Sequence, residues 1–159
     1  MNVISKIEYY LRSVLFVTVS LTISFIWANS VMTPSESAEI SDSFSKIIQN
    51  ILPQGDFLDF IFKYIRKIAH FTEYGILGIQ VAIYIFLRGC ERKPCFICAS
   101  IVFGICIALA DEGIQYFTGR GNSLLDVLID ECGFLFCMSL TLLLFEVAKY
   151  IYNKKTKVR

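Results

Sequence analysis

Four long stretches of the chain contain no charged residue, and this limits the possible folds more than any other feature of the sequence. The stretches lie between Arg12 and Glu36, between Glu73 and Arg88, between Lys93 and Asp111, and between Glu131 and Glu146. A bilayer has a hydrocarbon core about 30 Å thick, and a helix rising about 1.5 Å per residue crosses it in roughly 20 residues. We therefore predict four transmembrane helices, at residues 13–32, 68–87, 94–110 and 124–147.

The composition supports a membrane protein. Hydrophobic residues make up 55% of the chain and charged residues 18%, whereas soluble domains carry about 25% charged residues. This excludes a soluble globule and a disordered chain. The net charge of +1 lacks the basic surplus of a nucleic-acid binder, so we expect no nucleic-acid partner. We predict an all-α membrane protein with one domain, residues 1–159, in which the first apolar segment is a retained helix, because the cleavage pattern near Ala28 is poor and further spans follow.

Residues that end or start helices agree with this segmentation. They are Thr33-Pro34 after the first span, Gly89 after the second, Pro94 at the start of the third, and Asn122 or Ser123 before the fourth. Asp126 follows Ser123 by three residues, and this spacing resembles a capping box.

The distribution of Lys and Arg predicts the orientation. Four spans place both termini and the 88–93 loop on one side of the membrane. That side holds ten basic residues: Lys6, Arg12, Arg88, Arg92, Lys93, Lys149, Lys154, Lys155, Lys157 and Arg159. The opposite side holds five: Lys46, Lys63, Arg66, Lys67 and Arg120. The positive-inside rule therefore predicts cytoplasmic termini.

The connection at residues 33–66 is then extracellular. It opens with a polar turn at residues 33–37, and apolar residues follow at helical spacing: Phe44, Ile47, Ile48, Ile51 and Leu52. We predict a short interfacial helix here, and we favour an amphipathic packing segment over a ligand-binding arm. Apolar residues at 57–65 continue the same period and extend the second span outward.

Ionisable and amide side chains gather at the outer ends of the last three spans. They are His70, Glu73, Asp111, Glu112, Gln115, Asp126, Asp130 and Glu131, with Arg120 in the turn between spans three and four. Only 14 residues, roughly 21 Å of helix, separate Glu73 from Arg88, so Glu73 lies at or below the outer headgroups. Ionisable groups at this depth are costly unless they face protein, a partner charge or water.

We therefore expect these side chains to turn inward and to share a pocket. The spacings of three and four residues place His70 with Glu73, Asp111 with Gln115, and Asp126 with Asp130 on common helix faces. Such a pocket can hold a cation, perform acid/base chemistry or form an internal salt-bridge network, and we favour a ligand-binding or catalytic pocket. Glu112 and Glu131 cannot share a face with the aspartates that precede them, and one residue of each pair is expected to point toward the headgroups.

The cysteines and glycines are predicted to be packing residues. The pair Cys95 and Cys98 has a metal-site spacing, but no second pair and no nearby His completes a four-ligand site. The thiols within the spans do not support an extracellular disulfide framework. Gly75, Gly78 and Gly104 are expected at close helix contacts.

Two sequence blocks resemble the VanZ-like bacterial membrane proteins. Residues 66–78 read RKIAHFTEYGILG and are similar to the family pattern R-K-x-x-H-F-x-E-Y-x-x-L-G. Residues 110–120 read ADEGIQYFTGR, and with residues 126–130, DVLID, and Gly133 they resemble the second block. Asn29-Ser30 and residues 35–37 resemble the Ser-rich segment after the first helix.

The chain departs from the family pattern at two positions. Ile114 stands where the family commonly has a His, so a two-histidine site is not available, and Cys137 replaces a usual Gly. The resemblance implies a multi-pass protein of the bacterial cell membrane, related to proteins linked with resistance to glycopeptide antibiotics, particularly teicoplanin. It does not imply a reaction.

Three functions follow as expectations. The first is a pocket that binds or modifies an envelope lipid or a lipid-linked cell-wall intermediate, in which Arg66, Lys67 and Arg120 hold phosphate. The acid, base or catalytic candidates are His70, Glu73, Asp111 and Glu112, and the substrate-binding candidates are Lys67, Gln115, Arg120, Asp126 and Asp130. The alternatives are a non-enzymatic protein with a structural polar cluster and a small cation or proton transporter. The sequence assigns no cofactor, no metal and no oligomeric state; membrane lipids are the expected partners.

Overall fold

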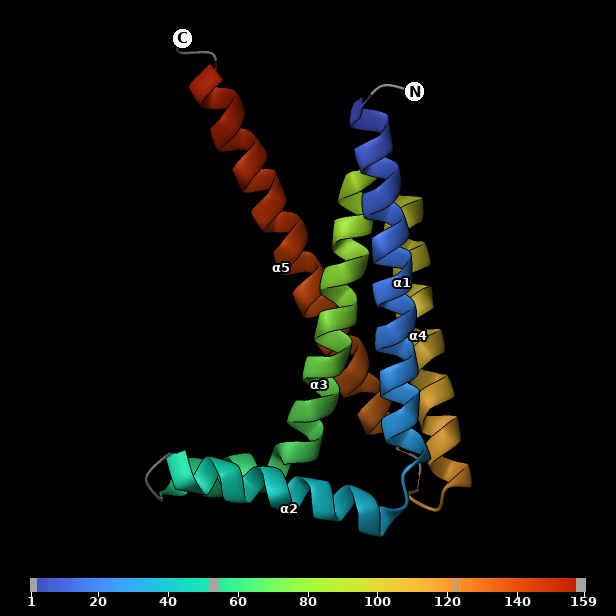
Figure 1. The fold of residues 1–159 in the computed structure, drawn as a ribbon, viewed down its shortest axis with the longest axis vertical. Helices are drawn as coiled ribbons and strands as arrows, with labels where there is room; N and C mark the ends of the chain where they lie inside the picture. Colours follow the sequence, from blue (N-terminus) through green and yellow to red (C-terminus); the bar gives the residue numbers. More distant parts are fainter. Residues whose placement is uncertain (1–2, 52–54, 122, 157–159) are drawn as a thin grey trace.

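The computed structural model describes residues 3–51, 55–121 and 123–156, and these form five helices (Figure 1). The helices are α1 (Val3–Val31), α2 (Pro34–Ile51), α3 (Asp56–Leu87), α4 (Pro94–Phe117) and α5 (Leu124–Thr156). The prediction of an all-α protein with four membrane helices and one additional helix between the first two is confirmed.

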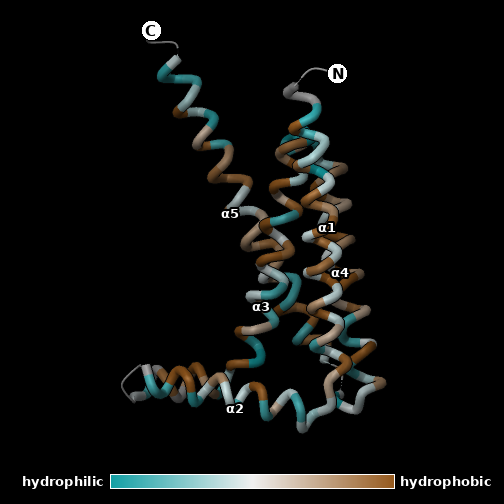
Figure 2. Tube along the Cα trace, viewed as in Figure 1, coloured by the Kyte–Doolittle hydropathy of each residue, from teal (hydrophilic) through white to brown (hydrophobic). Residues whose placement is uncertain are grey.

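Four of these helices, all except α2, are long and apolar enough to cross a membrane. Figure 2 shows that hydrophobic residues cover most of their length. Large apolar side chains such as Phe16, Leu21, Leu143 and Leu144 are exposed on their outer surfaces. A soluble domain rarely exposes so much contiguous apolar surface, and lipid is the environment that suits it.

The helices are longer than the predicted spans. Helix α1 begins before residue 13, α4 continues beyond residue 110 to Phe117, and α5 continues beyond residue 147 to Thr156. The predicted spans end at charged residues. Such residues mark where a helix leaves the hydrocarbon core, but they do not end the helix. The starts of α4 at Pro94 and of α5 at Leu124 agree with the prediction.

Helix α2 lies across the end of the bundle that is opposite the termini (Figure 1). The turn expected at residues 33–37 is instead the first turn of this helix. The Thr33 N–H and hydroxyl both donate to Glu36 Oε2 at 2.8 Å, and the Glu36 N–H faces Thr33 Oγ1 at 3.4 Å. This is a capping box, with Pro34 in the first helical position. Leu52, the last apolar position expected in this helix, lies outside the described residues.

Helix α3 has two parts. Its first turns run beside α2, and the helix then bends upward into the bundle (Figure 1). The predicted outward extension of the second span is therefore helical, but it lies along α2. At the other end Gly89, with φ 61°, ends the helix, because the N–H groups of Gly89 and Cys90 return to the carbonyls of Phe86 and Ile85.

The closest helix contact is the crossing of α3 and α5. A Cβ atom on Gly78 would lie 2.2 Å from the Phe134 carbonyl oxygen, and one on Gly133 would lie 2.3 Å from the Phe71 carbonyl oxygen. The two backbones therefore touch without side chains between them, as small residues allow in membrane helices. Gly75 meets Cys137 at the same crossing, and Gly104 of α4 faces α5, so the predicted packing roles of these glycines are confirmed.

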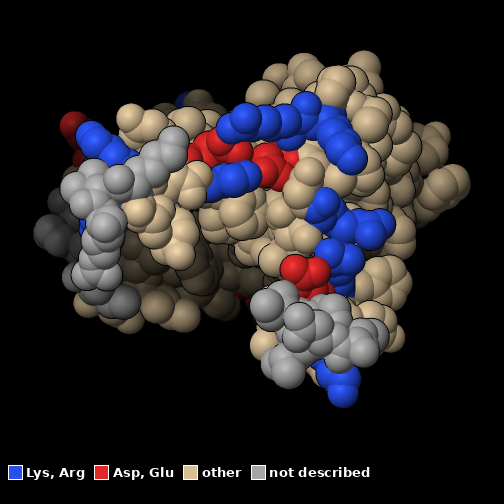
Figure 3. All heavy atoms as spheres, turned by 90° about the horizontal axis from the view of Figure 1, so that it is seen from above, with Lys and Arg blue, Asp and Glu red and all other residues tan. Residues whose placement is uncertain are grey.

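Both termini lie at the same end of the bundle (Figure 1). Seen from that end, Lys and Arg side chains are prominent, with few acidic ones (Figure 3). Arg92 pairs there with Glu146 at 2.7 Å. Lys149 donates a hydrogen bond to Glu91 at 2.9 Å, which holds the pKa of Glu91 below its usual value. Lys157 and Arg159, which also belong to the predicted basic set, lie outside the described residues.

Candidate functional site

The α3–α5 crossing brings His70 and Asp130 together. His70 directly precedes Phe71, and Asp130 lies three residues before Gly133, so both side chains are next to the backbone contact. The distance from His70 Nδ1 to Asp130 Oδ1 is 3.2 Å. The Asp130 side chain is fully buried, and 17% of the His70 side chain is exposed.

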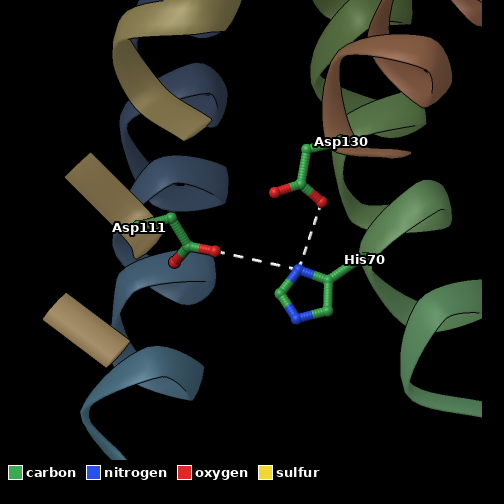
Figure 4. Close-up of side chains that lie close together, drawn as sticks. All are labelled: His70, Asp111 and Asp130. Atoms are coloured by element: carbon green, nitrogen blue, oxygen red, sulfur yellow. Dashed lines mark ion pairs between the residues drawn. The ribbon is translucent and has the colours of Figure 1, made fainter. Parts of the chain in front are cut away.

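Helix α4 adds Asp111 to this pair. Its Oδ2 atom lies 3.7 Å from His70 Nδ1, and its side chain is also fully buried. Figure 4 shows the two carboxylates turned toward the same imidazole nitrogen from two different helices. Asp111 is held in place by hydrogen bonds from the Ser30 hydroxyl of α1 and from Gln115 Nε2, the latter 3.2 Å long.

Arg120 is positioned by the end of α4. Gly119, with φ 77°, allows the Gly119 and Arg120 N–H groups to bond back to the carbonyls of Tyr116 and Gln115. The Arg120 guanidinium donates to the Asn29 carbonyl at 2.8 Å. Burial, and then the nearby positive charge of Arg66, lower the pKa of Arg120.

Glu73 is tied to the same place from α3. Asn29 Nδ2 donates to Glu73 Oε1 at 2.8 Å, so Asn29 bridges Glu73 and Arg120 through its side chain and its carbonyl. This bridge joins the last turn of α1 to the end of α4 and to α3.

A cavity of about 590 Å³ opens between α1, α2 and α3. Its polar lining consists of Asn29, Ser30, Ser41, Arg66, His70, Thr72, Glu73 and Arg120. Its apolar lining consists mainly of Phe25, Met32, Ile40, Phe44, Ile48, Ile61, Ile65, Ile68 and Ala69. Helix α2, expected only to pack, therefore forms one wall of the cavity. His70 connects this cavity to the buried aspartates behind it.

The expected site residues do not all share this cavity. His70, Glu73 and Arg120 line it. Asp111, Gln115 and Asp130 lie buried outside its lining. Lys67 instead pairs with Asp126 at 3.9 Å. The residues expected in a single pocket are thus divided among three places: the cavity, a buried aspartate cluster and a separate ion pair.

Glu112 of α4 accepts a hydrogen bond from the backbone at the start of α5. Its Oε2 accepts the backbone N–H of Ser123 at 2.7 Å, directly before α5. The Ser123 hydroxyl accepts the N–H of Leu125 at 3.2 Å. The expected cap at Ser123 is confirmed, but the reciprocal acceptor is Glu112 of α4 and not Asp126. Asn122, the alternative cap, lies outside the described residues.

Neither Glu112 nor Glu131 points to the headgroups, contrary to expectation. Both are buried, with Glu131 on the face of α5 toward Gly104, where a Cβ atom would meet Glu131 Oε2 at 2.6 Å. The expectation was wrong because α4 packs against both α1 and α5, and α5 packs against both α3 and α4, so that consecutive residues of either helix can both be buried.

Three polar residues at or beside the buried cluster were not predicted from the sequence. Asn29 and Ser30 were recognised only as part of a Ser-rich segment, although two polar residues at the end of an apolar span are a usable signal. Tyr74 follows His70 by four residues and therefore lies on the same face of α3. Its side chain is buried, and its hydroxyl has no hydrogen-bond partner within the described part of the chain.

The fold and this cluster define a multi-pass membrane protein with a polar site at the end of its bundle away from the termini. Residues 13–146 match the family model described as VanZ/LLP1, and the chain belongs to this family. The family resemblance of the sequence is therefore confirmed. Comparisons with curated proteins and with solved structures give no match.

Proposed function

We propose that the cavity between α1, α2 and α3 binds a phosphate group that is attached to a hydrocarbon chain. The source is an envelope lipid or a lipid-linked cell-wall intermediate. The hydrocarbon lies against the apolar wall of α2 and α3, and the phosphate lies at the two guanidinium groups. One observation carries the proposal: a long apolar wall and two arginines, Arg66 and Arg120, line one cavity.

The charges in the cavity favour an anion. Arg66 lies near enough to Arg120 for its positive charge to lower the pKa of Arg120, after the larger effect of burial. Among the residues that the structure describes, neither guanidinium has a carboxylate partner within 4.0 Å. Two unpaired guanidiniums are costly near a bilayer, and a phosphate with its several oxygens can bind both through paired N–H groups.

Residues suited to acid/base chemistry border the same cavity. His70 and Glu73 both line it, so a bound phosphate ester lies beside an imidazole and a carboxylate. An imidazole and a carboxylate can serve as acid and base in the modification of a lipid headgroup. Binding is the core of the proposal, and chemical modification is its extension.

The proposal includes the orientation and the compartment. With the termini in the cytoplasm of a bacterial cell, the cavity faces the outer leaflet of the cell membrane, where lipid-linked wall intermediates are used. Binding of such an intermediate there connects the chain to the teicoplanin resistance that its family resemblance implies.

Dodecyl phosphate is a suitable probe, because it combines one phosphate with one alkyl chain. We expect saturable binding of about one molecule per chain, measured by calorimetry on the protein in nanodiscs of zwitterionic lipid. Dodecanol and inorganic phosphate each lack one half of the interaction and should bind much more weakly. Arg66→Ala should weaken dodecyl phosphate binding by about tenfold, equivalent to about 1.4 kcal/mol.

Arg92→Ala is the matched control. Arg92 lies at the opposite end of the bundle, where 80% of its side chain is exposed, so its loss removes a positive charge without touching the cavity. Arg120→Lys tests whether the planar guanidinium is required. Equal binding of dodecyl phosphate to Arg66→Ala, Arg120→Lys and wild-type protein would refute the proposal.

The alternative is a purely structural network. The hydrogen bonds of Asn29 to Glu73 and of Ser30 to Asp111 do join α1 to α3 and α4, which favours a role in folding. In that case Glu73→Gln lowers the thermal stability and leaves dodecyl phosphate binding per folded molecule unchanged. Under the binding proposal the affinity changes in protein that is still folded.

A further inference from the structure

The geometry points to a site for one divalent transition-metal cation between His70, Asp111 and Asp130. This inference goes beyond phosphate binding, and it rests on the buried cluster behind the cavity. Three helices contribute one ligand each: α3 provides the imidazole, α4 and α5 provide the carboxylates (Figure 4).

The ligand atoms lie close to the spacing that one ion requires, so that small side-chain shifts would let all three bind it. One nitrogen and two carboxylate oxygens all lie within 4.8 Å of one another. The distances from His70 Nδ1 are 3.2 Å to Asp130 and 3.7 Å to Asp111. Two ligands that each bind a tetrahedral zinc ion at about 2.0–2.1 Å are themselves about 3.3 Å apart.

The charge of the cluster calls for a cation. Asp111 and Asp130 are both fully buried, and in the described part of the chain His70 is the only cationic side chain within 4.0 Å of either. When both carboxylates are ionised, even a protonated His70 leaves one negative charge in a medium of low dielectric constant, where an unpaired charge is very costly. A divalent ion bound to a neutral imidazole balances both carboxylates.

Unpartnered polar atoms point to the same position. His70 Nδ1 and Asp130 Oδ1 lie 3.2 Å apart but do not have the geometry of a hydrogen bond, so neither atom has a hydrogen-bond partner among the described residues. The second carboxylate oxygen of Asp130 has none there either. The buried hydroxyl of Tyr74, on the same face of α3 as His70, is also unpartnered there. Asp111, in contrast, is oriented by Ser30 and Gln115, as second-layer donors orient a metal-binding carboxylate.

The ligand types select the class of ion. An imidazole with two carboxylates suits Zn²⁺, Co²⁺ or Mn²⁺, whereas Ca²⁺ requires six to eight oxygen ligands. Three protein ligands leave a coordination position free for water or for an oxygen of a bound molecule. Since His70 also lines the cavity, the ion lies directly behind the cavity wall.

The test measures bound metal in purified, folded protein. Cys95 and Cys98 are exposed, contrary to the packing role predicted for them, and exposed thiols bind metal nonspecifically. Both are therefore replaced by Ser in every protein tested. Protein incubated with Zn²⁺ and then desalted should contain about one ion per chain by elemental analysis. With Co²⁺ it should show the visible absorption bands of nitrogen and oxygen ligation, without a sulfur-to-metal charge-transfer band.

Asp130→Asn should reduce the bound metal at least tenfold. Glu131→Gln is the matched control, because it also neutralises a buried carboxylate of α5 but lies outside the cluster. The inference is overturned if the parent protein binds no ion, or if Asp130→Asn retains it. If Asp130→Asn does not fold, the test uses the parent protein alone. Removal of the metal with a chelator should then lower its melting temperature, and added Zn²⁺ should restore it. An unchanged melting temperature overturns the inference.

The metal site and the phosphate site fail in different measurements. Arg66→Ala should bind dodecyl phosphate weakly and retain its metal. If neither the parent protein nor any of the variants binds metal, but dodecyl phosphate still binds as expected, only the metal inference is overturned. Intact metal binding with no effect of Arg66→Ala on dodecyl phosphate overturns only the phosphate proposal.

Discussion

Replacing Gly133 by Ala tests how the α3–α5 crossing holds the site together. The new Cβ atom would lie 2.3 Å from the Phe71 carbonyl oxygen and 3.0 Å from the Phe71 Cα atom. Ordinary contacts begin at 3.4 Å, so the two backbones must separate by about 1 Å, because a backbone cannot rotate away as a side chain can. Overpacking of this kind costs about 1–3 kcal/mol.

The same substitution at Gly113 should have the opposite effect. Gly113 also lies inside a helix, but a Cβ atom there meets nothing within 4 Å. Replacing Gly by Ala in a helix interior gains about 0.5–1 kcal/mol, because less backbone entropy is lost on folding. The two variants therefore add the same methyl group with and without a steric conflict.

Thermal unfolding in detergent, followed by fluorescence, measures both effects. Trp27 is the only tryptophan and packs against the core. On the scale of globular domains of this size, about 2–4 °C per kcal/mol, Gly133→Ala should lower the melting temperature by roughly 2–12 °C. Gly113→Ala should raise it slightly. If Gly133→Ala equals or exceeds the wild-type melting temperature, the backbone contact is not as close as described and the explanation for the position of His70 fails.

Three further results are expected. Glu112→Ala should lower stability by about 1–3 kcal/mol in thermal unfolding, because the Ser123 N–H loses its acceptor; Asp126→Asn should have much less effect, and the reverse order would contradict the cap assignment. The hydrogen bonds from Thr33 lower the pKa of Glu36 in the folded protein. The cap therefore stabilises α2 fully at pH values above about 4.3, the ordinary pKa of Glu, and this stabilisation is lost as the pH falls through the lowered pKa of Glu36. Opening of the first α2 turn, measured by hydrogen exchange, should therefore increase only in that acidic range. If opening does not increase there, the cap assignment is contradicted. A fluorescent protein fused to the C-terminus should fluoresce and alkaline phosphatase at the same place should be inactive; active phosphatase there would reverse the proposed orientation.

The sequence was sufficient to predict the membrane segments and the end of the bundle at which the polar residues meet. Both predictions depend on local features: the charge-free stretches, and the number of residues between Glu73 and Arg88 at the other end of the same span. Such features need no knowledge of which helix faces which.

The division of the polar residues among a cavity, a buried cluster and a cap could not be predicted. It depends on the rotation of each helix, which is set by backbone contacts such as that between Gly133 and Phe71. The position of Glu112 depends on the loop after α4 bringing the Ser123 N–H back to it. The bend in α3 was missed because apolar residues keep the helical period through it.

Helix α5 leans away from the other helices toward its C-terminal end (Figure 1). Its 33 residues give a length of about 50 Å, far more than the 30 Å hydrocarbon core, and long helices adapt to bilayer thickness by tilting. The backbone contact at Gly133 lies near the opposite end, only three residues from Asp130. Farther along α5, Glu146 and Lys149 are tied to the 88–93 loop through Arg92 and Glu91. A thicker or thinner bilayer would therefore tilt mainly the turns beyond Lys149, and the carboxylate of Asp130 would keep its place beside His70.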